Sequence, residues 1–203
     1  MKTLRIGIDV DGCLGNFNEA YADLLRKEGA TIPTIDNYFP NTWHWAKALG
    51  ISKELDDRVW KQIKESGTFW RNITPFEGTY EFLKDLAKGY ATSDDIYFIT
   101  HREGAQAKQQ TEDWLIENGF DFNVTVLCTG DKGPVAKALG LTHFLDDRNE
   151  NCLSVSAQSP VTKTYMYAQP WNQAQIGIPR IYDLSFFLRE LAVASGQLVE
   201  VSA

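Results

Sequence analysis

Cysteine is scarce in this 203-residue sequence, which contains only Cys13, Cys128 and Cys152 and no CxxC pair. An odd number of cysteines without such spacing argues against a disulfide framework and gives no zinc-ligand pattern. Long apolar runs are also missing: none approaches about eighteen residues, so we expect no membrane-spanning segment. The first residues lead directly into an expected strand rather than into a secretory leader, and we therefore expect a cytoplasmic protein.

Positive charge is in deficit, with 20 Lys and Arg against 27 Asp and Glu and a formal net charge of -7. Binding along a nucleic-acid backbone needs an excess of basic residues on one face, which argues against a long nucleic acid as partner. A small anion in a locally positive pocket remains compatible with this charge. Hydrophobic residues make up 43% and aromatic residues 12%, enough for a folded chain with a sizeable core.

Apolar segments of strand length alternate along the chain with segments of helical periodicity. Strands are expected at 4–8, 96–100, 123–128, 143–145 and 161–167. Helices are expected at 16–28, 52–67, 79–88, 105–118, 135–139 and 183–193, several of them ending at a glycine. This alternation predicts an α/β fold built on a doubly wound parallel sheet.

The first crossover of this sheet is unusually long. About ninety residues separate the first two expected strands, although about a dozen suffice to connect parallel strands. The excess predicts a small inserted helical subdomain at 15–75, a cap, on a core formed by 1–14 and 76–203. The insertion contains a turn-rich stretch at 33–41 and four of the six tryptophans, Trp43, Trp45, Trp60 and Trp70.

Polar residues stand at the carboxyl ends of the expected strands, where open parallel sheets bind their ligands. Asp9 and Asp11 lie at i and i+2, so an extended chain directs both carboxylates to one face. Gly12 then lets the backbone turn away from them with little steric cost. The later strand ends contribute Thr100 and His101, Asp131 and Lys132, and Asp146 and Asp147.

These residue types suit the binding of a metal ion and a phosphate. Carboxylates crowded at one edge repel one another unless a cation intervenes, and a hard cation with oxygen ligands, Mg²⁺, is the expected one. An amine near a helix start and a hydroxyl can hold the remaining phosphate oxygens. The candidate metal ligands are Asp9, Asp11, Asp146 and Asp147, and the candidates for phosphate binding are Thr100, His101 and Lys132.

The size of the rate acceleration that the reaction needs favours a covalent mechanism. Hydrolysis of a phosphate monoester is among the slowest uncatalysed reactions, and one positioned general acid contributes only about 10²–10⁴-fold. An aspartyl-phosphate route divides the task between a carboxylate that attacks phosphorus and a second that transfers protons. Asp9, nearest the strand end, is the expected nucleophile, and Asp11 is the expected acid/base.

The same residues resemble a known family. Asp9-Val10-Asp11-Gly12, Thr100 after an apolar strand, Lys132, and Asp146-Asp147 after another strand resemble the four motifs of the haloacid dehalogenase superfamily of Mg²⁺-dependent phosphatases. This resemblance covers about residues 5 to 150. Three shorter segments resemble the 5'(3')-deoxyribonucleotidase branch of this superfamily. They are 9–14 with Phe17 nearby, 69–75 ahead of Gly78, and 145–148.

The resemblance implies a Rossmann-like core and a phosphatase of (deoxy)nucleoside monophosphates. It implies that Asp9 is also a metal ligand and that Asp11 ligates Mg²⁺ through its carbonyl, with the Asp146-Asp147 pair completing the site. In the family an aromatic patch of the cap receives the base. Phe17 and Trp70 carry over at matching positions, and Trp43 is a further candidate in a segment that departs from the family's pattern. Cys13 stands where a threonine or valine is usual.

Several alternatives stay open. Lys137 competes with Lys132 for the phosphate, and Trp60 suits the cap core better than a stacking platform. His101 and Arg102 are more typical of solvent-facing residues than of ligands, although Arg102 could reach a phosphate. The alternative functions are a phosphatase of another small phosphometabolite, a phosphotransferase that uses an acceptor other than water, and a nucleotide-binding protein without turnover.

Overall fold

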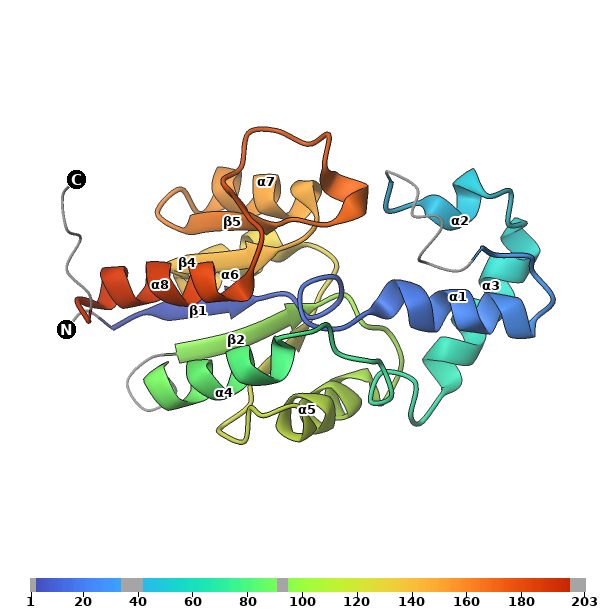
Figure 1. The fold of residues 1–203 in the computed structure, drawn as a ribbon, viewed down its shortest axis with the longest axis horizontal. Helices are drawn as coiled ribbons and strands as arrows, with labels where there is room; N and C mark the ends of the chain where they lie inside the picture. Colours follow the sequence, from blue (N-terminus) through green and yellow to red (C-terminus); the bar gives the residue numbers. More distant parts are fainter. Residues whose placement is uncertain (1–2, 34–41, 91–94, 198–203) are drawn as a thin grey trace.

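The structure, a computed structural model, describes residues 3–33, 42–90 and 95–197 (Figure 1). Within these residues, six parallel strands form one sheet in the order β3-β2-β1-β4-β5-β6, which confirms the predicted α/β doubly wound fold. The strand order reverses at β1, which lies between β2 and β4. The strands are β1 (Arg5–Ile8), β2 (Asp95–Thr100), β3 (Val126–Cys128), β4 (His143–Asp146), β5 (Lys163–Tyr167) and β6 (Arg180–Ile181).

Helices cover both faces of the sheet and extend beyond one end of it. One face packs against α4, α5 and α8, and the other against α6 and α7. The inserted helices α1, α2 and α3 lie past the carboxyl end of β1 (Figure 1). The helices are α1 (Phe17–Lys27), α2 (Trp45–Ala48), α3 (Lys53–Glu65), α4 (Thr79–Tyr90), α5 (Ala107–Glu117), α6 (Lys132–Leu139), α7 (Asn149–Gln158) and α8 (Leu184–Ser195).

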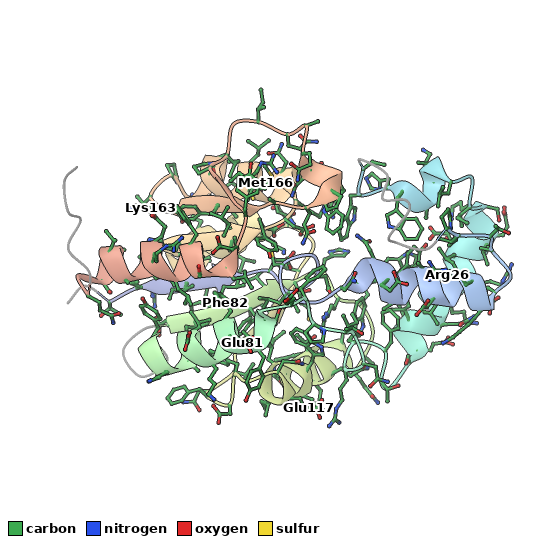
Figure 2. The ribbon with its side chains drawn as sticks, viewed as in Figure 1. Arg26, Glu81, Phe82, Glu117, Lys163 and Met166 are labelled. Carbon is green, nitrogen blue, oxygen red and sulfur yellow. The ribbon has the colours of Figure 1, made fainter. Side chains whose placement is uncertain are left out.

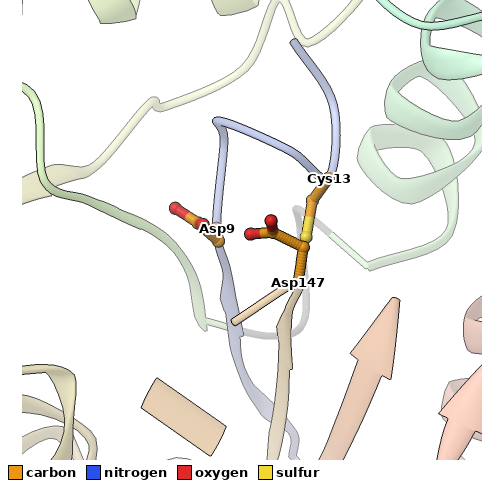
Figure 3. A group of neighbouring side chains, drawn as sticks. All are labelled: Asp9, Cys13 and Asp147. Carbon is orange, nitrogen blue, oxygen red and sulfur yellow. The ribbon is translucent and has the colours of Figure 1, made fainter. Parts of the chain in front are cut away.

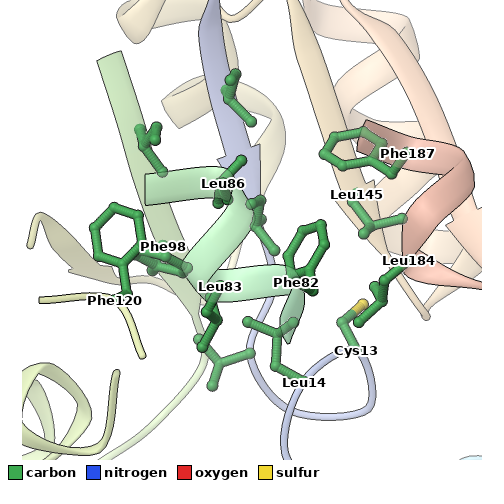
Figure 4. Close-up of a cluster of buried hydrophobic side chains, with 14 of the residues drawn as sticks. Cys13, Leu14, Phe82, Leu83, Leu86, Phe98, Phe120, Leu145, Leu184 and Phe187 are labelled. Atoms are coloured by element: carbon green, nitrogen blue, oxygen red, sulfur yellow. The ribbon is translucent and has the colours of Figure 1, made fainter. Parts of the chain in front are cut away.

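The apolar run of β1 follows from its central position, because both of its faces are covered. Ile6 and Ile8 are fully buried in the larger hydrophobic core, between the sheet and α4, α5 and α8. Figure 4 shows other members of this core, among them Phe82 of α4 and Phe187 of α8. Gly7 faces the opposite side, where a Cβ would lie 2.5 Å from Leu141 Cδ1. The sequence Ile-Gly-Ile therefore follows from the packing of β1: one face of the strand has room for the two isoleucine side chains, and the other face has no room for a side chain at residue 7.

The outer layers show the same separation of apolar and charged side chains. Phe82 of α4 and Met166 of β5 are buried between layers, whereas Glu81, Glu117 and Lys163 are exposed (Figure 2). Within the described residues, no helix is both long enough and apolar enough to cross a membrane.

Two expected helices begin where local hydrogen bonding favours a helix start. The Asn16 side chain accepts a hydrogen bond from the Glu19 N–H, and the Ser52 side chain accepts one from the Leu55 N–H. Each satisfies a backbone donor that has no partner inside the helix. At the far end of α6, Gly140 takes a left-handed conformation with φ of 62°, which a glycine adopts without steric cost.

The structure also contains elements that the sequence patterns did not predict. They are α2, α7, β6 and a 3₁₀ turn at Pro170–Asn172, all short or weakly patterned. In α7 only Cys152 and Val155 are buried, so its apolar periodicity is weak. Helix α6 begins at Lys132 rather than at 135, because the Asp131 side chain caps it. The turn-rich stretch predicted at 33–41 lies, from residue 34 on, outside the described residues.

The inserted segment has a hydrophobic cluster of its own. Its buried members include Phe17, Tyr21 and Leu25 of α1 and Val59 and Ile63 of α3. The two chain connections to the sheet lie side by side: the Asn16 N–H donates to the Thr74 carbonyl at 2.9 Å, and the Phe76 N–H donates to the Leu14 carbonyl at 2.8 Å. The insertion therefore leaves and rejoins the sheet at one place, directly after Asp9 and Asp11.

Candidate active site

A cavity of about 110 Å³ lies at the carboxyl ends of β1 and β2, between the sheet and the inserted helices. This is the point of strand-order reversal, where ligands bind in such sheets. Asp146 and Asp147, at the end of β4, do not line it and are fully buried. The predicted site residues that line the cavity are Asp9, Asp11, Phe17, Trp43, Trp70, Thr100, His101 and Lys132.

Lys132 connects two of the strand ends. Its Nζ lies 2.6 Å from Asp9 Oδ1 and 2.7 Å from Asp146 Oδ2, and the side chain is 2% exposed. Burial alone would lower the pKa of Lys132, but the Asp146 and Asp9 carboxylates outweigh it and hold the pKa above its ordinary value. The lysine is therefore a fixed cation between two carboxylates. Lys137, the alternative candidate, is exposed on α6.

Asp9 is a buried carboxylate in a negative environment. Burial raises the pKa of Asp9 to about 7; Lys132 opposes this shift, while Asp146 and Asp11 add to it. Its Oδ1 also accepts a hydrogen bond from the Val10 N–H at 2.8 Å. The carboxylate is therefore oriented by the backbone and by Lys132, and it lines the cavity.

The two neighbouring aspartates of β4 differ in what they bind. Both Asp146 oxygens accept hydrogen bonds within the protein, from Lys132, from the Arg148 N–H and from the Asn151 amide. Asp147 Oδ2 accepts from Trp171 Nε1 at 2.6 Å, but among the described residues Oδ1 of Asp147 has no hydrogen-bond partner. A buried carboxylate oxygen without a partner is costly and is suited to a cation.

Asp147 also explains why residue 12 is a glycine. Gly12 has φ of 87°, and a Cβ there would lie 2.4 Å from Asp147 Oδ2. The loop after β1 thus passes directly against this carboxylate. Gln169 fixes the loop further, since its Nε2 donates to the Gly12 carbonyl at 2.7 Å.

Asp9, Cys13 and Asp147 form the one group of possible metal ligands found in the described ranges, with ligand atoms within 4.8 Å of one another. In Figure 3 the Asp147 carboxylate points toward the strand end that carries Asp9, and the Cys13 sulfur lies beside Asp147. Burial, with the nearby carboxylates, holds the pKa of the Cys13 thiol well above its ordinary value, so it stays protonated. The two carboxylates fit a hard cation such as Mg²⁺, and the thiol does not.

Asp11 does not stand free in the cavity. Arg102 donates to both of its oxygens, Nε to Oδ2 and Nη2 to Oδ1, each at 2.9 Å, and Thr100 Oγ1 donates to Oδ2 at 3.2 Å. The expectation that Arg102 faces solvent is wrong, because its side chain is fully buried. A buried arginine needs a charged partner, and that partner lies 91 residues earlier in the sequence.

His101 lies at the outer edge of the cavity. Its side chain is 57% exposed, and its Nε2 lies 3.5 Å from Glu103 Oε1. The expectation of a solvent-facing residue therefore describes His101 correctly, although it lines the cavity.

The opposite side of the cavity is an aromatic wall, formed by Phe17, Trp43, Trp60 and Trp70. Phe17 stands at its centre and stacks on Trp43 and Trp70 with ring centroids 6.2 and 5.7 Å apart. Trp70 is only 2% exposed, whereas Trp43 and Trp60 are half-buried. Trp60 therefore lines the cavity, rather than lying only in the cap core as its helical spacing suggested.

Several residues of this site were not predicted from the sequence. Arg148 and Asn151 line the cavity, and the Arg148 guanidinium lies 5.3 Å from the Trp43 ring centroid. Trp171 and Gln169 bind Asp147 and the Gly12 loop. Their position just after β5, at the same edge of the sheet, is the one sequence signal that could have identified the last two.

No protein-family model matches the chain. A protein of Bacillus cereus named "Putative nucleotidase" is 25% identical over 183 residues, which cover 88% of this chain and 93% of that protein. A solved L-2-haloacid dehalogenase matches with a TM-score of 0.55 over 94% of this chain and 100% of that one, at 14% identity. A structure titled "putative phosphoglycolate phosphatase", from Lactobacillus plantarum, matches with a TM-score of 0.57 over 93% of this chain and 99% of that one, at 11% identity. At such identities these structures bear on the fold alone.

Proposed function

The chain has the fold of the haloacid dehalogenase superfamily, and from this premise we propose that it is a Mg²⁺-dependent phosphomonoesterase. The observation that carries the proposal is the charge of the site. Four carboxylates, those of Asp9, Asp11, Asp146 and Asp147, meet two buried cations, Lys132 and Arg102. When all four carboxylates are ionised, they exceed the two cations by two negative charges, which one divalent cation would balance beside a carboxylate that faces the cavity.

Asp9 and Asp147 are the proposed side-chain ligands of Mg²⁺, joined by the backbone carbonyl of Asp11. Asp146 instead positions Lys132, because both of its oxygens are already engaged inside the protein. When bound, Mg²⁺ would neutralise charge on the phosphoryl oxygens and so allow an anion into an acidic site.

The proposed reaction has two steps. The reaction starts with Asp11 protonated, the proton having been taken up from solvent: an Asp9 oxygen attacks phosphorus, and the bond from phosphorus to the leaving oxygen breaks while Asp11 gives its proton to that oxygen. Water then attacks the phosphorus of the aspartyl-phosphate, Asp11 takes a proton from this water, and the Asp9 carboxylate leaves. The sum consumes one water, releases an alcohol and inorganic phosphate, and returns both aspartates to their starting states.

Lys132 has a fixed part in this scheme. It holds one Asp9 oxygen and leaves the carboxylate oriented for attack, and its charge faces the place where phosphate oxygens would lie. The Thr100 hydroxyl donates to Asp11 in the structure, and we propose that its single hydrogen turns to a phosphate oxygen when substrate is bound. His101 is the proposed contact at the outer edge of the cavity.

The proposed substrates are (deoxy)nucleoside monophosphates. The aromatic wall stands opposite the carboxylates, and Trp43 keeps part of its ring exposed for stacking with a base. The Bacillus cereus relative carries the name "Putative nucleotidase", which supports the same class. We propose that residues 15–75 act as a cap that carries this wall.

The test is phosphate release by the purified chain from nucleoside monophosphates and from sugar phosphates, with Mg²⁺ and after its removal by a chelator. We expect Mg²⁺-dependent release without any added acceptor, fastest with a nucleoside monophosphate. Release only in the presence of an acceptor alcohol would show a phosphotransferase. Nucleotide binding without any release would show a binding protein and contradict the proposal.

A further inference from the structure

Arg102 makes more contacts than a phosphate ligand would need. All three of its guanidinium nitrogens donate inside the protein, and its side chain is fully buried. Nε and Nη2 each donate to one Asp11 oxygen, and we call this pair of parallel hydrogen bonds the fork. Nη1 donates to the Trp70 carbonyl at 3.3 Å and to Thr111 Oγ1 at 3.1 Å. The guanidinium therefore joins Asp11 to α5 and to the aromatic wall.

Two indole rings lie against the same guanidinium. Its carbon lies 5.1 Å from the Trp70 ring centroid and 5.7 Å from that of Trp114. Both rings are themselves fixed, because Trp70 Nε1 donates to the Glu103 carbonyl and Trp114 Nε1 donates to the Ile73 carbonyl. The plane of the fork is thus held by hydrogen bonds and by ring contacts together.

Stability alone is a poor reason for this arrangement. Burying a guanidinium and a carboxylate is costly, and replacing such pairs by apolar residues is often neutral or stabilising. Asp11 is also not sealed from the cavity, since it lines the cavity and its side chain keeps 13% of its surface exposed. One part of the carboxylate is therefore clamped while another faces the place where the substrate would bind.

We propose that Arg102 is a positioning residue, which fixes the Asp11 carboxylate for proton transfer and ties it to the aromatic wall through Trp70. The inference rests on the proposed function, since it assigns Arg102 to the acid/base step of that reaction. A lysine could not replace it, because a single ammonium cannot form the two parallel hydrogen bonds of the fork.

The test is a double-mutant cycle with Arg102→Lys, Asp11→Asn and the double variant. The readout is kcat/KM for a nucleoside monophosphate, with KM and thermal unfolding measured alongside. We expect Arg102→Lys to lower kcat/KM by about 10²-fold, close to the range for loss of a general acid, with little change in KM. In the Asp11→Asn background the same substitution should cost less than about threefold.

The leaving group supplies a readout that a merely structural role would not move. A nitrophenolate leaves without being protonated, so kcat/KM for p-nitrophenyl phosphate should fall much less in Arg102→Lys than kcat/KM for the nucleotide. Arg71→Lys is the matched control, because Arg71 is exposed and its partners, Glu117 and Asp113, lie on the surface of α5. It should leave both substrates unaffected.

The outcomes separate this inference from the proposed function. If the wild-type chain releases no phosphate, the proposed function fails. If the wild type is active but Arg102→Lys costs the same with and without Asp11, or affects both substrates equally, only the role of Arg102 is overturned. Should Arg102→Lys not fold, Thr111→Val removes one acceptor of Nη1 and should give a smaller loss that again disappears in the Asp11→Asn background.

Discussion

The two sides of the cavity are built differently. On one side, charged groups stand at the ends of strands and pair at short distances: Lys132 lies between Asp9 and Asp146, and Arg102 donates to Asp11. On the other side, aromatic rings from the inserted segment contact one another in stacked or tilted pairs. Hydrogen bonds fix directions, whereas ring contacts chiefly fill space.

Under the proposed function, we expect the reaction on the polar side and recognition of the substrate on the aromatic side. A step that moves a phosphoryl group requires reacting atoms held to within a fraction of an ångström, which a hydrogen-bonded strand end can supply. A wall of rings tolerates a range of flat ligands. Substitutions on the polar side should therefore change kcat, and substitutions on the aromatic side should change KM.

The largest expected effect is that of Asp9→Asn. The amide keeps the shape of the side chain but removes the negative charge of the attacking carboxylate, so phosphate release should fall by more than about 10³-fold. Thermal unfolding should show little loss of stability, because the substitution also removes a buried negative charge. A variant with a near-wild-type rate of phosphate release would rule out Asp9 as the nucleophile.

Lys132→Met should be the most destabilising change on the polar side. It leaves the Asp9 and Asp146 carboxylates buried without their shared cation, and breaking a buried ion pair in this way costs about 3–5 kcal/mol. The measurement is denaturant unfolding without Mg²⁺, and added Mg²⁺ should restore part of the loss. Lys137→Met, on the exposed face of the same helix, is the control. Equal stability of the two variants would show that Lys132 is not needed to balance the carboxylates.

Stability without Mg²⁺ should depend on pH in a direction set by Asp9. Burial raises the pKa of Asp9 to about 7, against about 3.9 in an unfolded chain. Between these values the folded protein binds more protons than the unfolded one, so stability falls as the pH rises from about 4 to 7. Mg²⁺ competes with the proton, and the stabilisation it gives should grow over the same interval. Thermal unfolding from about pH 5 to about pH 8, with Mg²⁺ and with a chelator, tests both trends. A midpoint that does not fall with pH in the chelator would contradict the first trend. Midpoints that stay the same distance apart at every pH, with and without Mg²⁺, would contradict the second.

The smallest expected effect lies on the aromatic side, at Trp43. Removing a half-buried ring that stacks on a base should raise KM for a nucleoside monophosphate by about fivefold or more. KM for a small phosphate ester should not change, because such a substrate has no base. Equal changes for both substrates would make Trp43 part of the packing and not of recognition.

Trp70 provides the contrast within the aromatic wall. It is 2% exposed, and Phe17 and the Arg102 guanidinium lie against its ring. Trp70→Ala should therefore cost about 3–5 kcal/mol of stability, far more than Trp43→Ala. A weakly destabilised Trp70→Ala variant would remove this distinction between the two rings.

The residues on these two sides of the cavity also differ in how well they could be predicted from the sequence. Alternating strands and helices predict a parallel sheet, and such a sheet brings the ends of its strands to one edge, so Asp9, Thr100 and Asp146 could be grouped from spacing alone. The pairing of Arg102 with Asp11 could not be predicted, because only the folded chain shows that Arg102 is buried against this carboxylate. The spacing of apolar residues indicates which positions are buried, but it does not indicate which charged residues pair with each other.

The site residues that loops and the inserted segment supply could not be predicted for a similar reason. Trp171 follows β5 in a short turn without periodicity, and its hydrogen bond to Asp147 joins elements 24 residues apart. In the inserted segment, helical spacing placed Trp60 in the core, while the structure places it along the cavity. Which side of a small helix faces a ligand depends on how the helix packs against the sheet, and spacing alone does not determine that.

The central claim, a phosphoryl group carried on Asp9, is tested most directly by acid-quenching the protein during turnover of a nucleoside monophosphate with Mg²⁺. Peptide mass spectrometry of the quenched protein then locates any covalent phosphoryl group. The account predicts an acyl-phosphate on the peptide that contains Asp9, present in the wild type and lost in Asp9→Asn. Turnover without such an adduct, or an adduct on another residue, would contradict it.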